Sequence, residues 1–360
     1  MKKFFGIFLL IVTAIIPFGL CITFLCTFIS PAKLWIPNAV GLGFPFLLFL
    51  SAILGIVYLF LLKRRCIIFF AAIILNIPNI IHYVSLSSSE KEPQKKENQI
   101  KVLSYNVNLF DFYAHIDKRN ATRKKILNFI SDTKADIICF EEYYETKNGS
   151  FSIAEYLVDN GYIYHTKRNE NYRAYYGNVI YSRLPIVNED TIAGLSSLYA
   201  HFADIVVRPK DTVRVFNMHL YSNKLDKNDH DFYNDLIKGK ENISYRKGIF
   251  KILDKINMSA KVRDKQVSHL LKNISETHYP VILCGDMNET PISYCYSQFE
   301  KNLDDVFLEL GNGTGSTYNG IFPAYRIDYI FYKRLKPVYF NTFSVKYSDH
   351  FPLCATFSVK

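Results

Sequence analysis

Residues 281–288 read Val-Ile-Leu-Cys-Gly-Asp-Met-Asn, an apolar run that ends in glycine, aspartate and asparagine. The apolar part predicts a buried strand. Asp286 and Asn288 then fall at the end of that strand, where polar groups escape the desolvation cost of the core. This pattern alone is weak, because Gly-Asp-x-Asn occurs in many loops. Whether the pattern marks a catalytic site depends on the residues at the ends of the other strands.

Polar residues of similar kinds lie at the ends of the other strand-like runs. Several strand ends on one edge of a sheet can build a single pocket. Asn, Glu and Asp oxygens are the hard ligands that Mg²⁺ requires, whereas no Cys/His spacing favours zinc. Histidines beside carboxylates supply groups that titrate near neutral pH. The residues are Asn106 (SYNVN), Glu141 and Glu142 (IICFEE), His219 (FNMHL), Asp328 (YRIDYIF), and Asp349 and His350 in Ser348-Asp349-His350.

Most of these positions also have a simpler explanation. Asn106 alone would cap a turn, and Asp-His-x-Pro would be a turn in which Pro352 opens the last strand. Asp328 is harder to explain in this way, because a carboxylate inside an apolar strand must be paired or neutralised. The joint occurrence at ordered strand ends argues against coincidence and predicts a catalytic site.

Beyond residue 98 the chain alternates β-rich runs with helical stretches, which predicts a layered α/β domain. The helical stretches are Thr122–Ser131, with Asn120 or Thr122 as its cap, then Ile153–Val158 and Val262–Ile274. Ser222–Lys261, with helical pieces such as Ile249–Ile256, fits either an exposed insertion or a lid. The predicted strands are Ile100–Val107, Asp136–Phe140, Asn178–Tyr181, Val213–His219, Pro280–Cys284, Ile327–Tyr332 and Leu353–Val359.

Taken in order, the motifs resemble the endonuclease/exonuclease/phosphatase superfamily over about residues 100–360. The resemblance implies a four-layered α/β sandwich, in which two β-sheets pack face to face and helices flank them. It also implies an enzyme, a metal-dependent hydrolase of phosphate ester bonds. The motifs are Asn106, the acidic pair ending at Glu142, Ser182-Arg183-Leu184-Pro185-Ile186, His219, Asp286 with Asn288, Arg326-Ile327-Asp328-Tyr329, and Ser348-Asp349-His350.

The resemblance further implies a metal site and a water-activating group. Glu142 should ligate Mg²⁺, or alternatively Mn²⁺, together with Asn106 and Asp349. Asp286 should orient or deprotonate the attacking water, and Asn288 should hold a phosphate oxygen.

The remaining implied roles concern the phosphate. Asp328 should pair with His350 and raise the pKa of its ring, so that the charged ring contacts the phosphate. His219 should contact the phosphate or assist the leaving group, and Thr317 should be a further phosphate contact. Such groups suit a transition state that spreads negative charge over the phosphoryl oxygens.

Departures from the family's pattern narrow the function. Many relatives have Gln where this chain has Glu141, so the choice of Glu142 over Glu141 as the metal ligand rests on alignment. Apurinic endonucleases have Asp at the position of Asn108 and Tyr at that of His219, which argues against repair of abasic sites. The Cys-Asp-Arg run of inositol 5-phosphatases is replaced by Tyr-Arg-Ile-Asp.

The N-terminal part carries three runs without charge, Phe4–Ala32, Leu34–Leu62 and Cys66–Ser89. Each is long enough to cross a bilayer core, which takes roughly 20 apolar residues in a helix. We expect about three transmembrane helices in residues 1–86, a linker at 87–98 and the catalytic domain at 99–360. The alternative for the first run is a cleaved signal peptide, which the two further apolar runs disfavour.

Basic residues predict the orientation of the anchor. Lys2 and Lys3 flank the first run, and Lys63, Arg64 and Arg65 fill the loop between the second and third. We therefore expect a multi-pass protein of the inner (cytoplasmic) membrane. Its N-terminus would be cytoplasmic and its catalytic domain extracytoplasmic, in the periplasm.

The charge and the cysteine content exclude few classes of function. The net charge is +10, but residues 1–89 hold six of the 43 basic residues and no acidic one, which leaves 37 basic and 33 acidic residues elsewhere. This mild excess suits an anionic substrate but is not a nucleic-acid-binding signature. The seven cysteines show no paired spacing, so buried free thiols are expected.

The sequence thus predicts a membrane-anchored, Mg²⁺-dependent phosphodiesterase whose substrate is a nucleic acid or a phospholipid headgroup, with no obligate protein partner. One alternative is a phosphomonoesterase of the same fold, which only substrate tests can separate from a diesterase. Another is a membrane-tethered binding protein without activity, which the complete residue set disfavours.

Overall fold

The structure is a computed structural model, and it describes residues 2–61, 63–87, 92–146, 153–166, 174–193, 198–224, 245–320 and 325–359. The chain forms two compact units. The first unit comprises Met1–Tyr83, Tyr221–Lys265 and Thr290–Gln298, and the second comprises Val84–Leu220, Gln266–Glu289 and Phe299–Lys360.

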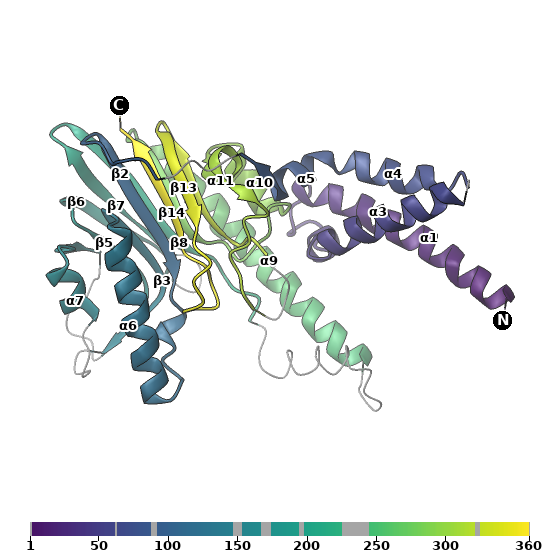
Figure 1. Ribbon diagram of the computed structural model, residues 1–360, viewed down its shortest axis with the longest axis horizontal. Coiled ribbons are helices and arrows are strands. Elements are labelled where there is room, and N and C mark those ends of the chain that lie inside the picture. Colours follow the sequence, from purple (N-terminus) through teal and green to yellow (C-terminus); the bar gives the residue numbers. More distant parts are fainter. Residues whose placement is uncertain are drawn as a thin grey trace. The chain divides into compact units, whose positions relative to one another are not determined.

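The second unit contains two six-stranded mixed sheets (Figure 1). The first has β2 parallel to β3, and the second has β8 parallel to β9. In sheet order, the first consists of β13 (Lys336–Thr342), β14 (Leu353–Ser358), β2 (Gln99–Asn106), β3 (Ile137–Thr146), β5 (Ala174–Ser182) and β4 (Tyr164–His165). The second consists of β10 (Asp304–Asp305), β12 (Asp328–Lys333), β9 (Val281–Asp286), β8 (Asp211–His219), β7 (Leu198–Arg208) and β6 (Ile186–Ala193).

The two sheets pack on each other through a continuous apolar core. Side chains alternate between the two faces of a strand, so every second residue points into this layer. Ile137 and Cys139 of β3 lie there together with Ile282 and Cys284 of β9, all fully buried. The expected face-to-face sheets are confirmed, and Cys139, Cys284, Cys295 and Cys354 are buried free thiols as predicted.

Helices flank the sheets. On the first sheet, α6 (Ile116–Thr133) packs Ile126, Leu127 and Ile130 against the side chains of β2, β3 and β5 that point away from the inter-sheet core. The helix starts at Ile116 after His115, so the predicted caps Asn120 and Thr122 are wrong. Its first turns carry polar residues, and the apolar period appears only where the helix meets the sheet. The neighbouring α7 (Ile153–Asp159) lies where expected.

One long helix replaces two predicted pieces. Ile249–Ile256 and Val262–Ile274 are both parts of α9 (Tyr245–Glu276). Residues 266–276 belong to the second unit, where the Tyr199 hydroxyl lies 3.0 Å from His269 Nδ1, so this part of α9 packs against β7. Of the predicted insertion, residues 225–244 lie outside the described residues. The shorter elements of the chain are η2 (Asn108–Phe110), α10 (Tyr294–Glu300), α11 (Val306–Leu310), β1 (Ser85–Leu86) and β11 (Asn312–Gly313).

The first unit is helical, but its helices are not the three continuous spans expected. Among the described residues, no single helix is both long and apolar enough to cross a membrane; α4 and α5 reach that length only together, across a bend of 59°. The bend lies at Asn76, whose side-chain amide donates to Leu20 O at 2.8 Å and Ala72 O at 3.0 Å. The helices are α1 (Lys2–Phe24), η1 (Leu25–Thr27), α2 (Ile36–Gly41), α3 (Phe44–Phe60), α4 (Cys66–Leu75) and α5 (Ile77–Tyr83).

The boundary between the predicted domains is more complex than a single linker. Tyr221–Lys265 and Thr290–Gln298 belong to the same compact unit as the N-terminal helices. Within that unit, Ile292 is fully buried beside Leu20 and Phe44, and Ser297 Oγ donates to Thr27 O at 2.7 Å.

Candidate active site

Three adjacent strands of the second sheet place a histidine and two aspartates side by side. His219 ends β8 and stands opposite Asp286, which ends the parallel strand β9. Asp286 in turn stands opposite Asp328, which begins the antiparallel strand β12. Because paired residues in neighbouring strands lie side by side, this register places all three at one edge of the sheet.

Gly285 makes the close approach of β8 and β9 achievable at this edge. Its φ is +130°, and a Cβ on this residue would lie 1.9 Å from Met218 O. Only glycine combines that backbone conformation with that spacing. The Gly-Asp pair seen in the sequence is therefore a requirement of the backbone just before the site.

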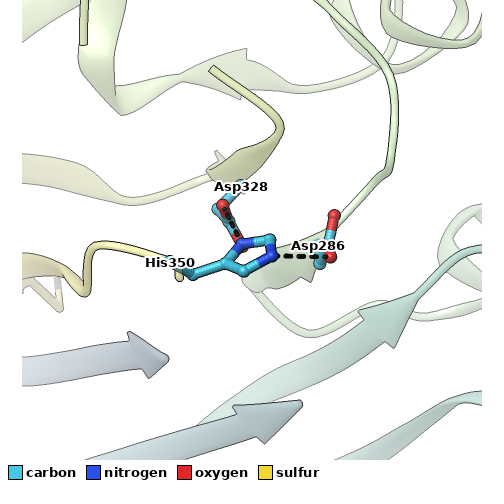
Figure 2. Close-up of side chains that lie close together, drawn as sticks. All are labelled: Asp286, Asp328 and His350. Atoms are coloured by element: carbon cyan, nitrogen blue, oxygen red, sulfur yellow. Dashed lines mark hydrogen bonds and ion pairs between the residues drawn. The ribbon is translucent and has the colours of Figure 1, made fainter. Parts of the chain in front are cut away.

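The His350 ring is hydrogen-bonded to the Asp328 carboxylate (Figure 2). Its Nδ1 lies 2.9 Å from Asp328 Oδ2, and its Nε2 lies 3.8 Å from Asp286 Oδ2. All three side chains are buried. Burial alone would lower the pKa of His350, but Asp328 and then Asp286, with the hydrogen bond to Asp328, raise it to about 10. The ring is therefore a buried cation at neutral pH, and the predicted Asp328–His350 pair is present.

Asp286 lies at the centre of these contacts. Its Oδ1 accepts from the Asn288 backbone N–H at 2.8 Å, and its Oδ2 accepts from Asn106 Nδ2 at 3.2 Å. Burial, and next the charge of Asp328, raises the pKa of Asp286 to about 6, although His350, His219 and the Asn288 N–H act in the opposite direction. A carboxyl group with this pKa can accept a proton from water near neutral pH.

Asn288 and His219 stand beside Asp286. Asn288 adopts a φ of +55°, and its Nδ2 donates to Leu220 O at 3.0 Å. His219 Nε2 lies 3.7 Å from Asp286 Oδ2 and 3.7 Å from Glu142 Oε1.

The first sheet contributes Asn106 and the acidic pair. Asn106 ends β2 opposite Glu141 of β3. Glu141 is fully buried within 3.4 Å of Ser104 Oγ, and burial, with Asp328 next, raises its pKa well above the ordinary value. Glu142 is partly exposed and faces His219. Of the two, Glu142 is the side chain that a cation can reach.

Asp349 joins the group through Ser348. The Ser348 hydroxyl lies 2.9 Å from Asn106 O and 3.1 Å from Asp349 Oδ1, which ties the loop before β14 to the end of β2. Ser348 belongs to the predicted motif Ser348-Asp349-His350, but the sequence assigned no role to its hydroxyl.

Thr317 does not offer the direct phosphate contact that the sequence suggested. It is fully buried, and its hydroxyl accepts from the backbone N–H groups of Ile327 and Asp328, both at 3.0 Å. The hydroxyl therefore holds the start of β12. The ring of the neighbouring Tyr318, for which the sequence predicted no role, lies 5.2 Å from that of His350 between centroids.

Two oxygen-rich groups could be considered for a divalent cation. Asp286, Asp328 and His350 offer ligand atoms within 4.8 Å of one another, and a cation bound there would have to displace the proton of the His350 ring. Glu142 Oε1 faces His219, Asn106 Oδ1 accepts from the Asn108 N–H at 3.1 Å, and Asp349 Oδ1 lies 3.1 Å from the Ser348 hydroxyl. Oxygens of these kinds are the ligands that Mg²⁺ and Mn²⁺ prefer.

Models of known protein families match two parts of this chain. The sequence model described as the Endonuclease/Exonuclease/phosphatase family matches residues 103–350, and a domain of unknown function matches residues 2–83. No curated protein matches the chain in sequence.

Solved structures are similar to this chain over about three quarters of its length. TDP2 from C. elegans is 15% identical, with a TM-score of 0.50 over 74% of this chain and 77% of that one. An endonuclease/exonuclease/phosphatase from Beutenbergia cavernae is 16% identical, with a TM-score of 0.48 over 73% and 72%. The human nocturnin catalytic domain, solved with bound sulfate, is 17% identical, with a TM-score of 0.49 over 74% and 95%.

Proposed function

This chain belongs to the endonuclease/exonuclease/phosphatase family, a family of phosphate ester hydrolases, and we propose that it is a Mg²⁺-dependent phosphodiesterase. The observation that carries the proposal is the set of contacts around Asp286. This one buried carboxylate lies within 4 Å of Asn106, His219 and His350, and its other oxygen accepts from the Asn288 N–H.

Each group has a distinct task in the proposed reaction. Asp286 orients the water and takes its proton. The charged His350 ring binds a phosphate oxygen, and Asp328 keeps that ring protonated and fixed in direction. Asn288 donates to a second phosphate oxygen.

The remaining groups serve the leaving side and the cation. His219 stands on the opposite side of Asp286 from Asp328 and assists the departing oxygen. Glu142, Asn106 and Asp349 would hold the cation. When bound, it would offset the negative charge on the phosphate and on the leaving oxygen.

We further propose that the N-terminal helices anchor the enzyme in the inner membrane and that residues from about 87 onward lie outside the cytoplasm. Support comes from the three charge-free runs and from large apolar side chains exposed in the first unit, such as Phe18, Phe49 and Phe60. A reporter fused at residue 95 should behave as extracytoplasmic. A cytoplasmic readout would refute the topology but not the chemistry.

The substrate proposed is a phosphodiester of a nucleic acid or of a phospholipid headgroup. The test uses the full chain in detergent, because Tyr221–Lys265 and Thr290–Gln298 belong to the unit of the N-terminal helices. Bis(p-nitrophenyl) phosphate and p-nitrophenyl phosphate are compared with Mg²⁺ and with EDTA.

The proposal expects hydrolysis of the diester that requires Mg²⁺ and is lost in Asp286→Ala but kept in Asp304→Asn, which changes an exposed carboxylate. A preference for the monoester would instead indicate a phosphomonoesterase. Phosphate binding without turnover of either ester would indicate a binding protein. Nucleic acids, sphingomyelin and phosphoinositides are then screened with the active protein.

A further inference from the structure

A β-bulge lies in β3 at the acidic pair. Phe140 pairs with Val179 of β5, and the next pair is Tyr143 with Gly177. Two residues of β3, Glu141 and Glu142, therefore stand opposite the single residue 178. Glu142 has a φ of +49°, in the left-handed region that residues other than glycine rarely adopt.

The bulge decides where the Glu142 side chain points. Ile138, Phe140 and Tyr143 all pack in the apolar cluster beneath α6. Regular alternation would place residue 142, not residue 143, on that face. Because of the extra residue, Tyr143 and not Glu142 points into the apolar cluster. The Glu142 side chain points toward the site, where its Oε1 lies 3.7 Å from His219 Nε2.

One side chain of the opposite sheet bonds to the strand pair at this bulge. Asn217 of β8 is fully buried, and its Nδ2 donates to Phe140 O at 2.8 Å and to Val179 O at 3.3 Å. These carbonyls belong to the last regular pair before the bulge. The two acceptors also settle which end of the amide is the nitrogen.

The amide of Asn217 satisfies the strand pair at the bulge but not its own oxygen. Among the described residues, Asn217 Oδ1 is buried without a hydrogen-bond partner, which costs about 1–3 kcal/mol. A leucine of nearly the same shape would avoid that cost but would remove the donor to Phe140 O and Val179 O. The amide is therefore kept for the carbonyls at the bulge, two residues before His219.

We propose that Asn217 is a positioning residue for the cation site: it fixes the bulge in β3 and thereby holds Glu142 toward His219. The inference deepens the proposed function, because it takes Glu142 to be a metal ligand. Asn217 touches neither substrate nor cation. It acts through the backbone of Phe140, and β8 carries both Asn217 and His219, so one strand sets both sides of the site.

The first experiment measures Mn²⁺ binding to metal-free full chain by electron paramagnetic resonance. Asn217→Leu should weaken binding by roughly 10–100-fold, as losing a partner that orients a ligand typically does. Val213→Ala removes buried volume elsewhere on β8 and serves as the matched control, with Mn²⁺ binding unchanged. Equal binding in Asn217→Leu and wild type would overturn the proposal.

A double-mutant cycle then asks whether the effect passes through Glu142. In a Glu142→Gln background, Asn217→Leu should weaken Mn²⁺ binding by less than about 2-fold, because the side chain that it positions no longer ligates well. The same full loss in both backgrounds would show that Asn217 acts elsewhere and would overturn the proposal.

Hydrogen exchange keeps the inference separate from the proposed function. Amides of residues 138–146 should exchange at least 10-fold faster in Asn217→Leu than in Val213→Ala. If wild type binds no Mn²⁺ but this difference appears, the proposed metal-dependent function fails while the bulge is still held by Asn217. If the difference is absent, the positioning role fails. Asn217→Ala, which also removes the donor, replaces the leucine variant if that one does not fold, with the same expected results.

Discussion

Asp328→Asn should move the alkaline limit of activity. In the folded protein the pKa of His350 is raised from 6.5 to about 10, with Asp328 the largest of the contributions that raise it. At 1.36 kcal/mol for each pKa unit, the site prefers the charged ring by about 5 kcal/mol. Asparagine keeps the 2.9 Å hydrogen bond to Nδ1 but removes the negative charge.

The size of the shift in the alkaline limit depends on how much of the preference for the charged His350 ring comes from Asp328. If Asp328 provides half of it or more, the alkaline limb of kcat/KM moves down by about two pH units or more. The folded protein also loses stability. A histidine whose pKa is raised contributes stability that is fully present below pH 6.5 and is lost as the pH rises through about 10. Asp328→Asn should therefore unfold more easily at pH 6 and differ little from wild type above pH 10.

The assay is the pH profile of kcat/KM for bis(p-nitrophenyl) phosphate, with the full chain in detergent and saturating Mg²⁺. The exposed carboxylate of Asp304 provides the control, since Asp304→Asn should leave the profile unchanged. An alkaline limb that stays in place in Asp328→Asn would refute the reasoning, because the charge of His350 would then not depend on its partner.

Three further predictions concern β9, and Gly313 of β11 provides a control for the last of them. Because Asp286 acts as the base only when ionised and its pKa is raised to about 6, kcat/KM should fall as the pH drops through about 6, as a pH profile would show. Asp286→Ala should lower kcat by roughly 10²–10⁴-fold without changing the circular dichroism spectrum, and a near-normal rate would remove Asp286 from the mechanism. Gly285→Ala should lower the free energy of unfolding by more than about 2 kcal/mol, measured in urea, since its Cβ would overlap Met218 O. Gly313→Ala, with positive φ but open space around it, should cost only about 1 kcal/mol.

The apolar strands and their polar ends were readable from the sequence. Continuous apolar runs such as 281–284 are typical of buried strands, and the predicted runs correspond to β2, β3, β5, β8, β9, β12 and β14. The strands β6, β7 and β13 were missed. β6 reads Ile-Val-Asn-Glu-Asp-Thr-Ile-Ala, and β7 carries His201 and Asp204, so their polar residues hid the strand pattern.

The parts of the structure that depend on contacts between distant segments could not be predicted from the sequence. The burial of the Thr317 hydroxyl follows from its hydrogen bonds to the start of β12, some ten residues away along the chain. The bulge at Glu142 depends on the pairing of β3 with β5 and on Asn217 from the other sheet. Pro78 marks the place of the bend near Asn76 in the sequence, whereas the hydrogen bond from the Asn76 amide to the Leu20 carbonyl depends on another helix.

The most direct test of the central claim is anomalous diffraction from crystals of the full chain grown with Mn²⁺ and inorganic phosphate. The account predicts a Mn²⁺ peak about 2.0–2.3 Å from a Glu142 oxygen, with phosphate between the ion and His350. A peak bonded to His350 Nε2, or phosphate bound away from Asp286 and Asn288, would contradict it.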